Sequence, residues 1–258
     1  MIVDIRAKIL ENRFVSGKTW LMRLEAPEIA KYSKPAQFVM VKPTTEDSFD
    51  PLLRRAFAIA DVDGDEIVLY YDIHGRGTKV LSERKVGEYV DVLGPLGKQL
   101  FPEDYKSYIL VGGGIGFAGL SLLMKYLRDK GKKFIALYGA RSKEDLSMIE
   151  WVKEKSFDVI YYTDDGSFGK KGLITQDLES IIEENPDSAL AVCGPTPMMK
   201  AVAKIAKQKN VPCYLSLETK MACGIGICIG CVVKDIESDN YVRVCYEGPV
   251  FEASEIEF

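Results

Sequence analysis

Four cysteines near the C-terminal end of the sequence have a spacing suited to redox chemistry. They form the pattern Cys223-x4-Cys228-x2-Cys231-x13-Cys245, in and after the run MACGIGICIGCVV. C-x4-C-x2-C with a distant fourth cysteine is the ligand spacing of plant-type [2Fe–2S] clusters, although the last interval here is shorter than in plant ferredoxins. A zinc site, which normally uses two CxxC pairs, and buried free thiols are the alternatives. The spacing favours a [2Fe–2S] cluster held by these four cysteines.

The loop that holds the first three cysteines alternates glycines with isoleucines. Glycine permits positive φ, which a backbone needs when three thiolates converge from one tight turn. The isoleucines are expected to shield the cluster from water and so to tune its potential. These residues are Gly224, Ile225, Gly226, Ile227, Ile229 and Gly230.

A glycine-rich run, LVGGGIGFAGL, is the second candidate site. It contains Gly114-x-Gly116-x-x-Gly119 between an expected strand and an expected helix, where backbone N–H groups can hold a pyrophosphate. The acidic residue usual at the end of the next strand is missing, because that strand ends in Arg141. Packing of a glycine-rich turn, without any ligand, is the alternative. The nucleotide candidates are Gly112, Gly113, Gly114 and Gly116.

The run CGPTPMM places Cys193 at a strand end before a helix, facing the ligand crevice of a doubly wound sheet. Cys193 is therefore a candidate contact for a nicotinamide, or else a buried inert thiol. The one histidine, His74, excludes a multi-histidine metal site, and we expect no catalytic role for it.

Arginines in the first hundred residues suggest an anion site. Arg54 and Arg55 begin the strand-like run RRAFAIA, and Gly77 with Thr78 lies at the start of a short helix-like run. Arginine beside a helix N-terminus can bind phosphate. Taken alone, a solvated arginine pair is the simpler interpretation, just as neighbouring aromatic residues are simply core.

Three segments must position these residues. Residues 1–103 contain short β-branched or aromatic runs separated by turns, which predicts a small antiparallel β-barrel with one helix near residues 77–87. Residues 104–217 alternate strands with helices, which predicts a doubly wound α/β domain on a parallel sheet. Residues 218–258 hold the cysteines and short strands. The predicted class is a multi-domain α+β protein.

Composition narrows the function further. The 258 residues are 47% hydrophobic, and 34 basic against 38 acidic residues give a net charge of −4, which argues against nucleic-acid binding by bulk electrostatics. No apolar run reaches the roughly 18–20 residues of a membrane span. The start, MIVDIRAKIL, lacks the features of a signal peptide, so we expect a cytoplasmic protein without a membrane partner.

Taken together, RRAFA, GRGT, GGGIG and CGP, in this order, resemble the ferredoxin–NADP reductase superfamily over about the first 217 residues. With ETKMACGIGICIGC and the fourth cysteine added, the whole chain resembles the electron-transfer subunits of type B dihydroorotate dehydrogenases. The resemblance implies FAD in the barrel, NAD in the doubly wound domain and a [2Fe–2S] cluster. It also implies a partner flavoprotein that oxidises dihydroorotate with FMN in pyrimidine biosynthesis, as a heterotetramer of two copies of each subunit.

The resemblance also assigns cofactor-binding residues. Arg55 would pair with the FAD pyrophosphate, and Phe57 would pack near the isoalloxazine. Ala58 stands where the superfamily usually has Ser or Thr, so a backbone N–H or water would replace that hydrogen bond to flavin N5. The Ala118–Gly119 pair departs mildly from the Ala-Pro often found there. The remaining residues implied at the two cofactors are Ala56, Tyr70, Tyr71, Asp72, Gly77 and Thr78 on the flavin side, and Gly112 to Gly116, Cys193, Gly194 and Pro195 on the NAD side.

Because NAD+ accepts a hydride and a cluster passes single electrons, a flavin between them is the expected converter. No residue need act as an acid or base on an organic substrate. Alternatives are the small subunit of a bifurcating ferredoxin–NADP reductase, where an aspartate would replace Cys223, a sulfide-dehydrogenase type, or a non-catalytic redox sensor. Arg141 leaves NAD against NADP open on chemistry alone.

Overall fold

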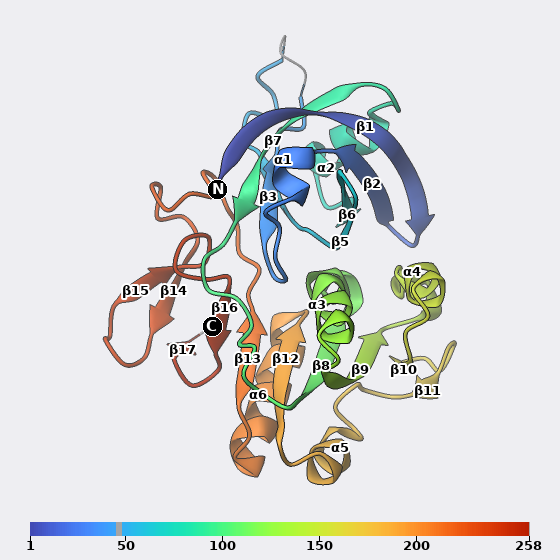
Figure 1. The fold of residues 1–258 in the computed structure, drawn as a ribbon, viewed down its shortest axis with the longest axis vertical. Helices are drawn as coiled ribbons and strands as arrows, with labels where there is room; N and C mark the ends of the chain where they lie inside the picture. The colour runs from blue at the N-terminus through green and yellow to red at the C-terminus, as the bar shows by residue number, and fades with distance from the viewer. Residues whose placement is uncertain (45–47, 258) are drawn as a thin grey trace.

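The structure, a computed structural model, describes residues 1–44 and 48–257 and arranges them around three sheets (Figure 1). The first sheet has seven antiparallel strands in the order β4-β3-β7-β1-β2-β6-β5. Because β4 ends at Ala58 and β5 begins at Asp61, the two edges of this curled sheet meet, which confirms the predicted antiparallel barrel. Its strands are β1 Val3–Ser16, β2 Thr19–Glu25, β3 Phe38–Val41, β4 Arg55–Ala58, β5 Asp61–Asp63, β6 Glu66–Asp72 and β7 Tyr89–Leu96.

Two helices belong to the barrel. Helix α2, Arg76–Glu83, lies between β6 and β7 and is shorter than the predicted run, because Arg84 already has an extended conformation. The one-turn helix α1, Pro27–Ala30, was not predicted, since four residues are too few to show a helical period.

The second sheet confirms the predicted α/β architecture. Its order is β11-β10-β9-β8-β12-β13-β16, parallel except for the last pair, and the chain reverses direction across the sheet between β8 and β12. Ligands of open α/β sheets bind at the carboxyl ends of the strands at such a switch point. The strands are β8 Ser107–Gly113, β9 Lys133–Ala140, β10 Val159–Thr163, β11 Lys170–Lys171, β12 Ser188–Cys193, β13 Cys213–Ser216 and β16 Val250–Glu252.

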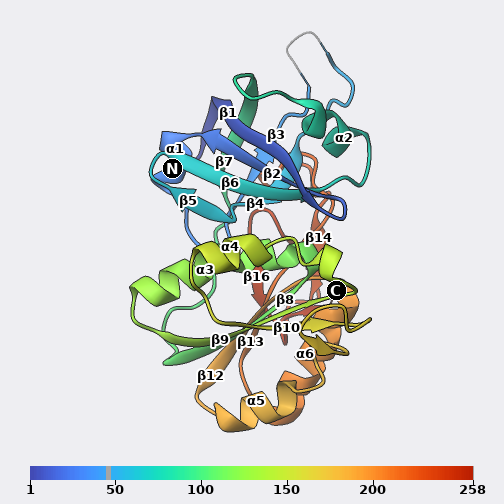
Figure 2. The same cartoon turned by 90° about the vertical axis from the view of Figure 1, so that its right-hand side faces the viewer.

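Helices cover both faces of the second sheet (Figure 2). Helix α3, Ala118–Asp129, follows the 3-10 turn η1, Gly114–Phe117, and lies with α4, Ile149–Glu154, between this sheet and the barrel. Helices α5, Leu178–Glu184, and α6, Thr196–Lys209, pack on the opposite face. The 3-10 turn η2, Lys143–Asp145, precedes α4.

The C-terminal segment forms a three-stranded sheet of β14 Val232–Asp235, β15 Tyr241–Arg243 and β17 Ile256–Glu257. Between β15 and β17 the chain returns to the second sheet, where β16 pairs antiparallel with β13. The cysteine segment is therefore attached to the α/β part through β16, which belongs to the second sheet.

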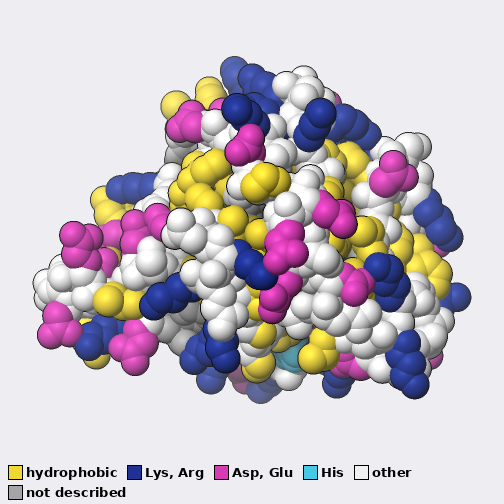
Figure 3. Space-filling view, turned by 90° about the horizontal axis from the view of Figure 1, so that it is seen from below, with side chains coloured by type: hydrophobic (Ala, Val, Ile, Leu, Met, Phe, Trp, Pro, Cys, Tyr) yellow, Lys and Arg dark blue, Asp and Glu magenta, His cyan; other side chains and the backbone are white. Residues whose placement is uncertain are grey.

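One buried core spans the barrel and the α/β part. Leu21, Val68 and Tyr70 of the barrel belong to the same hydrophobic cluster as Leu123 and Trp151 of the α/β part. A large apolar interface restricts relative motion of domains. Seen from below, the α/β face carries acidic and basic side chains intermixed (Figure 3). Within the described residues, no helix combines the length and hydropathy needed to cross a bilayer.

Candidate functional site

A cavity of about 610 Å³ opens where the barrel meets the carboxyl ends of the second sheet. This volume lies within the roughly 300–1,000 Å³ typical of cofactor pockets. Barrel strands β4 and β6 and helix α2 form one wall, and η1, α3 and the end of β12 form the other. Ten predicted cofactor residues line it: Arg55, Ala56, Phe57, Ala58, Tyr70, Tyr71, Asp72, Gly77, Thr78 and Cys193.

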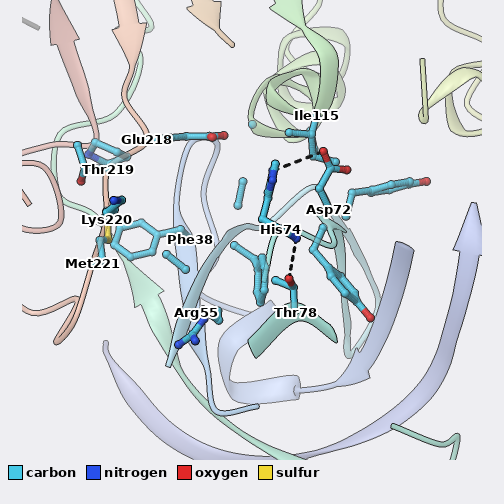
Figure 4. Close-up of a pocket in the computed structure, with 18 of the residues that line it drawn as sticks. Phe38, Arg55, Asp72, His74, Thr78, Ile115, Glu218, Thr219, Lys220 and Met221 are labelled. Carbon is cyan, nitrogen blue, oxygen red and sulfur yellow. Dashed lines mark hydrogen bonds and ion pairs between the residues drawn. The ribbon is translucent and has the colours of Figure 1, made fainter. Parts of the chain in front are cut away.

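The polar end of the cavity lies at the N-terminus of α2 (Figure 4). A Cβ added to Gly77 would lie 2.4 Å from Nε of Arg55, so the guanidinium rests directly against this turn. The Thr78 hydroxyl accepts a hydrogen bond from the His74 N–H at 3.0 Å and donates to the Gly75 carbonyl at 3.1 Å, which fixes the turn. The first N–H groups of a helix have no intrahelical acceptor. Arginine and free N–H groups together suit a pyrophosphate.

Aromatic side chains line the barrel wall of the cavity. The rings of Phe57 and Tyr71 lie 5.4 Å apart, and the Tyr71 hydroxyl donates to Asn12 at 2.8 Å. Burial raises the pKa of Tyr70 to about 12, so this phenol stays neutral. The backbone of Ala58 is held by pairing of β4 with β3. These flat apolar surfaces fit a planar ring system such as an isoalloxazine.

Packing gives two glycines of the GGGIG turn a structural role, beside the nucleotide role that the sequence predicts. A Cβ on Gly116 would lie 2.6 Å from Cα of Gly194, and one on Gly112 would lie 2.4 Å from the Phe117 ring. Both glycines are thus required by packing of the turn, while Gly114, with φ of +54°, faces open space. Ile115, Ala118 and Gly119 line the cavity. The predicted NAD-side residues that do not line it are Gly112, Gly113, Gly114, Gly116, Gly194 and Pro195. Their contact with NAD stays a prediction.

Cys193 lies on the cavity wall beside α3. A Cβ on Gly119 would lie 3.0 Å from its Sγ, so glycine lets the helix pack closely against the thiol. Burial raises the pKa of Cys193 well above that of an ordinary thiol. It is therefore a neutral, inert contact surface rather than a nucleophile.

The segment 216–221 was missed by the sequence interpretation, although all six of its residues line the cavity. The Glu218 side chain is exposed to the open cavity across from Ile115, and the cavity walls that displace water around it, with Asp72 nearby, raise the pKa of its carboxyl (Figure 4). The Thr219 hydroxyl is buried without a protein partner in the described structure, and a bound cofactor could satisfy it. The run ETK, directly before the cysteine motif, was the sequence feature that could have indicated this segment as part of the site. The full set is Ser216, Leu217, Glu218, Thr219, Lys220 and Met221.

His74 also borders the cavity. Its Nε2 lies 3.8 Å from the Asp72 carboxylate and 3.3 Å from the Lys18 ammonium. The ring is 68% exposed, and Lys18 is the closer partner of Asp72 at 3.1 Å. This arrangement assigns His74 to the rim of the cavity rather than to a reacting centre.

The four predicted ligand cysteines are free thiols that form two pairs, Cys223 with Cys228 and Cys231 with Cys245. Within the described residues, no three Cys, His, Asp or Glu side chains converge on a point that could hold a single metal ion. A [2Fe–2S] cluster takes two thiolates on each iron, so paired thiols suit it better than one zinc ion.

Backbone N–H groups surround these sulfurs. Burial opposes ionisation of Cys223, but N–H groups of Cys228 and Ile225, each 3.5 Å from its Sγ, lower its pKa to about 6. Burial, with Cys231 adjacent, raises the pKa of Cys245 to about 12. The N–H of Cys245 in turn donates to Cys231 at 3.4 Å. Such bonds stabilise ligated thiolates and set cluster potential.

The expected shielding by isoleucines is wrong. Ile227 and Ile229 are 76% and 67% exposed, and Cys228 between them is exposed, whereas Cys231 and Cys245 are buried. The glycines hold the loop down: a Cβ on Gly226 would lie 2.9 Å from Cβ of Tyr246. With the inner side of the loop filled in this way, the isoleucines point outward.

The cavity and the cysteine loop adjoin. Two residues beyond Met221, which lines the cavity, the chain reaches Cys223, a span of at most about 7 Å. A Cβ on Gly224 would lie 2.5 Å from Met40 on β3, and Phe38 of the same strand lines the cavity. One strand therefore contacts both sites.

Comparison with known proteins agrees with this geometry. The family described as "Iron-sulfur cluster binding domain of dihydroorotate dehydrogenase B" matches residues 218–257, and "Oxidoreductase NAD-binding domain" matches residues 110–204. A dihydroorotate dehydrogenase B (NAD(+)) electron transfer subunit homolog of Aquifex aeolicus is 44% identical over 99% of both chains. The electron transfer subunit of Bacillus velezensis is 38% identical over 96% of both chains.

Solved structures show the same fold. A chain of the NADH-dependent reduced ferredoxin-NADP oxidoreductase superposes with a TM-score of 0.85 at 29% identity, covering 97% of this chain and 89% of that one. The ferredoxin reductase of carbazole 1,9a-dioxygenase, with a TM-score of 0.68 at 24% identity, covers 82% and 66% and shares the fold. The fold and the paired sites define an NAD-linked flavin and iron–sulfur oxidoreductase subunit. Within that class, the chain belongs to the family of dihydroorotate dehydrogenase B electron transfer subunits.

Proposed function

We propose that this chain carries electrons from a partner subunit, which oxidises dihydroorotate with FMN, through a [2Fe–2S] cluster and FAD to NAD+, in pyrimidine biosynthesis. When bound, FAD exchanges electrons singly with an iron–sulfur centre and as a hydride with NAD, which is the conversion this relay requires. The observation that carries the proposal is the direct adjacency of the cavity and the cysteine loop, two residues apart at Met221 and Cys223.

The barrel residues hold and orient FAD. Arg55 and the N–H groups at the start of α2 bind the pyrophosphate, and Gly77 leaves room for the guanidinium. Phe57, Tyr70 and Ala58 form the apolar bed for the ring system and exclude water from it. Because Ala58 lacks a hydroxyl, a backbone N–H or a water donates toward flavin N5.

The residues of the opposite wall position NAD. The turns at Gly114 and Gly194 lie at the switch point of the sheet, where a dinucleotide binds. Cys193 and Gly119 would present a neutral, closely packed surface to the nicotinamide, with no competing nucleophile beside it.

The exposed isoleucines adjoin the partner. Large apolar side chains on a surface mark contact sites, and Ile227 and Ile229 flank the one exposed ligand cysteine, Cys228. The partner subunit docks here, in an assembly of two copies of each chain, and its apolar surface supplies the shielding that this chain's own fold does not.

Each segment carries one part of the relay: residues 1–103 bind FAD, residues 104–217 bind NAD, and residues 218–258 hold the cluster. The chain works in the cytoplasm, where a reducing environment keeps cysteines available as ligands. All six cysteines being free thiols supports this location.

An anaerobic visible spectrum of the purified chain, before and after NADH, tests the proposal. We expect flavin bands over a broad iron–sulfur absorbance, both bleaching with NADH. A colourless chain that binds zinc would overturn the proposal. Bands that do not respond to NADH would instead indicate a redox-sensing module.

A further inference from the structure

A buried carboxylate of the barrel lies among donors from the α/β part. The Asp61 side chain is 3% exposed and contacts three side chains of the opposite wall: the Lys125 ammonium, the Trp151 indole N–H at 2.9 Å and the Lys155 ammonium at 3.6 Å. Its other bond is local, from the Val62 N–H at 2.7 Å.

Backbone carbonyls on either side of Asp61 extend the contact. The Ser121 hydroxyl, fully buried, donates to the Ala60 carbonyl at 2.6 Å, and Lys125 also donates to the Val62 carbonyl at 2.7 Å. Leu122 of the same helix packs into the barrel core. We call Asp61 with Ser121, Lys125, Trp151 and Lys155 the barrel latch.

The barrel latch lies beside the cavity on both walls. On the barrel side, Ala58 lines the cavity and Asp61 follows three residues later. On the other side, Ala118 lines the cavity, and Ser121 and Lys125 follow it at i+3 and i+7, which is one face of α3. A shift of α3 against β5 would therefore change the width of the cavity directly.

We propose that Asp61 is a positioning residue, which locks α3 and α4 to the barrel edge and thereby sets the distance between nicotinamide and flavin. The inference rests on the proposed function. Loss of the Asp61 charge leaves the Lys125 ammonium without its carboxylate, whereas Lys155 keeps Glu154 at 3.1 Å, so the contact between barrel and α3 is expected to loosen rather than to re-form. Hydride transfer requires reacting atoms about 3–3.5 Å apart, and a misplacement of about 1 Å can cost 100-fold in rate.

The test compares Asp61→Asn with Asp177→Asn in the full chain loaded with FAD and cluster. Asp177 undergoes the same charge change but bonds only within the α/β part, to Tyr162 at 3.0 Å and Lys170 at 2.7 Å. The readouts are the single-turnover rate of flavin reduction at saturating NADH, the nicotinamide–flavin charge-transfer absorbance, the dissociation constant of NADH and the FAD content.

For Asp61→Asn we expect a rate about 10- to 100-fold lower and a weakened charge-transfer band, with NADH affinity within about 3-fold and unchanged FAD content. Asp177→Asn should leave both the rate and the band unchanged. If Asp61→Asn does not fold, Trp151→Phe removes one donor with its packing retained, and a drop of about 3- to 10-fold is expected.

An unchanged rate and band in the folded Asp61 or Trp151 variant would overturn the latch proposal, as would a loss of rate that only follows lost FAD. An equal loss in Asp177→Asn would overturn it as well. If wild-type flavin is not reduced by NADH, the proposed function fails instead, so the two failures are distinguishable.

Discussion

The cavity and the cysteine loop differ in the burial of their apolar side chains. The cavity is bordered by Tyr71 and Phe38, both buried, whereas the loop leaves Ile227 and Ile229 largely in solvent. Hydride transfer needs a closed, preorganised space, which both walls of the cavity supply from one shared core. In the proposed relay an electron enters the chain from the partner and needs an entry point at the surface, which the loop supplies at the exposed Cys228.

Loss of a cluster ligand should have the largest effect, because it disables the cysteine loop and leaves the cavity intact. We expect Cys228→Ser to reduce NAD+-linked turnover of the complex more than about 100-fold, because no relay remains between partner and FAD. Reduction of the chain's flavin by NADH should persist, since the cavity is intact. Turnover with dihydroorotate and NAD+, and stopped-flow flavin absorbance with NADH, measure the two. Retained NAD+ reduction by the complex would contradict the relay order.

Gly77→Ala should have the opposite effect: it should impair FAD binding in the cavity and leave the cysteine loop intact. The added Cβ would displace the Arg55 guanidinium, and a charge-assisted bond to phosphate is worth about 1.5–3 kcal/mol, so FAD affinity should fall about 10- to 150-fold. The cluster absorbance should remain. Gly64→Ala is the comparison, because Gly64 lies in the turn between β5 and β6, does not line the cavity and has nothing within 4 Å of its added Cβ, so its effect on FAD binding should stay below about 3-fold. Equal losses in the two variants would contradict the assigned pyrophosphate site.

Partner binding should depend on the outward isoleucines. Ile227→Ser is expected to weaken association with the catalytic subunit about 10-fold, because burial of one large apolar side chain contributes about 1.5–3 kcal/mol. Ile236→Ser, at an isoleucine 56% exposed on the neighbouring three-stranded sheet, serves as control. Calorimetric titration measures both. Equal affinities for the Ile227 variant and wild type would place the interface elsewhere.

Strain in the loop predicts a smaller effect. Ile229 has a φ of +51°, which costs a β-branched residue roughly 1–2 kcal/mol. Ile229→Gly should therefore raise the free energy of unfolding of the cluster-free chain by about 1 kcal/mol, measured by urea titration. A destabilised variant would show that the isoleucine contributes packing that outweighs its backbone cost.

The smallest effect concerns the cavity in the absence of cofactor. The pKa of Glu218 is raised, so its contribution to stability is present at pH below about 4.5 and is lost as pH rises through the raised pKa. Glu218→Gln should raise Tm of the cofactor-free chain at pH 7, by at most about 3 °C, and leave it unchanged at pH 4. Equal shifts at both pH values would exclude ionisation as the cause.

Local patterns in the sequence predicted the elements and the ligand chemistry. The cysteine ligand pattern, the barrel and the parallel sheet came from local patterns, whereas the cavity residues between Arg55 and Thr78 came from the resemblance to the ferredoxin–NADP reductase superfamily. These patterns did not predict the orientation of side chains in the loop, because whether Ile227 points inward or outward depends on how Tyr246 packs beneath Gly226.

Local sequence patterns also did not predict long-range contacts. Asp61 lies 90 residues from Trp151, and nothing near either residue in sequence indicates that they meet. The glycines of GGGIG show a related limit. Phosphate approach and tight packing both require glycine, and the contacts of Gly112 and Gly116 show the packing requirement while their contact with NAD stays a prediction.

The most direct test of the central claim is anaerobic stopped-flow absorbance of the reconstituted complex mixed with dihydroorotate, first without NAD+ and then with it. We expect the cluster and the FAD of this chain both to bleach without NAD+ and to recover when NAD+ is added, as NADH forms. NADH formation while the cluster stays oxidised throughout would contradict it.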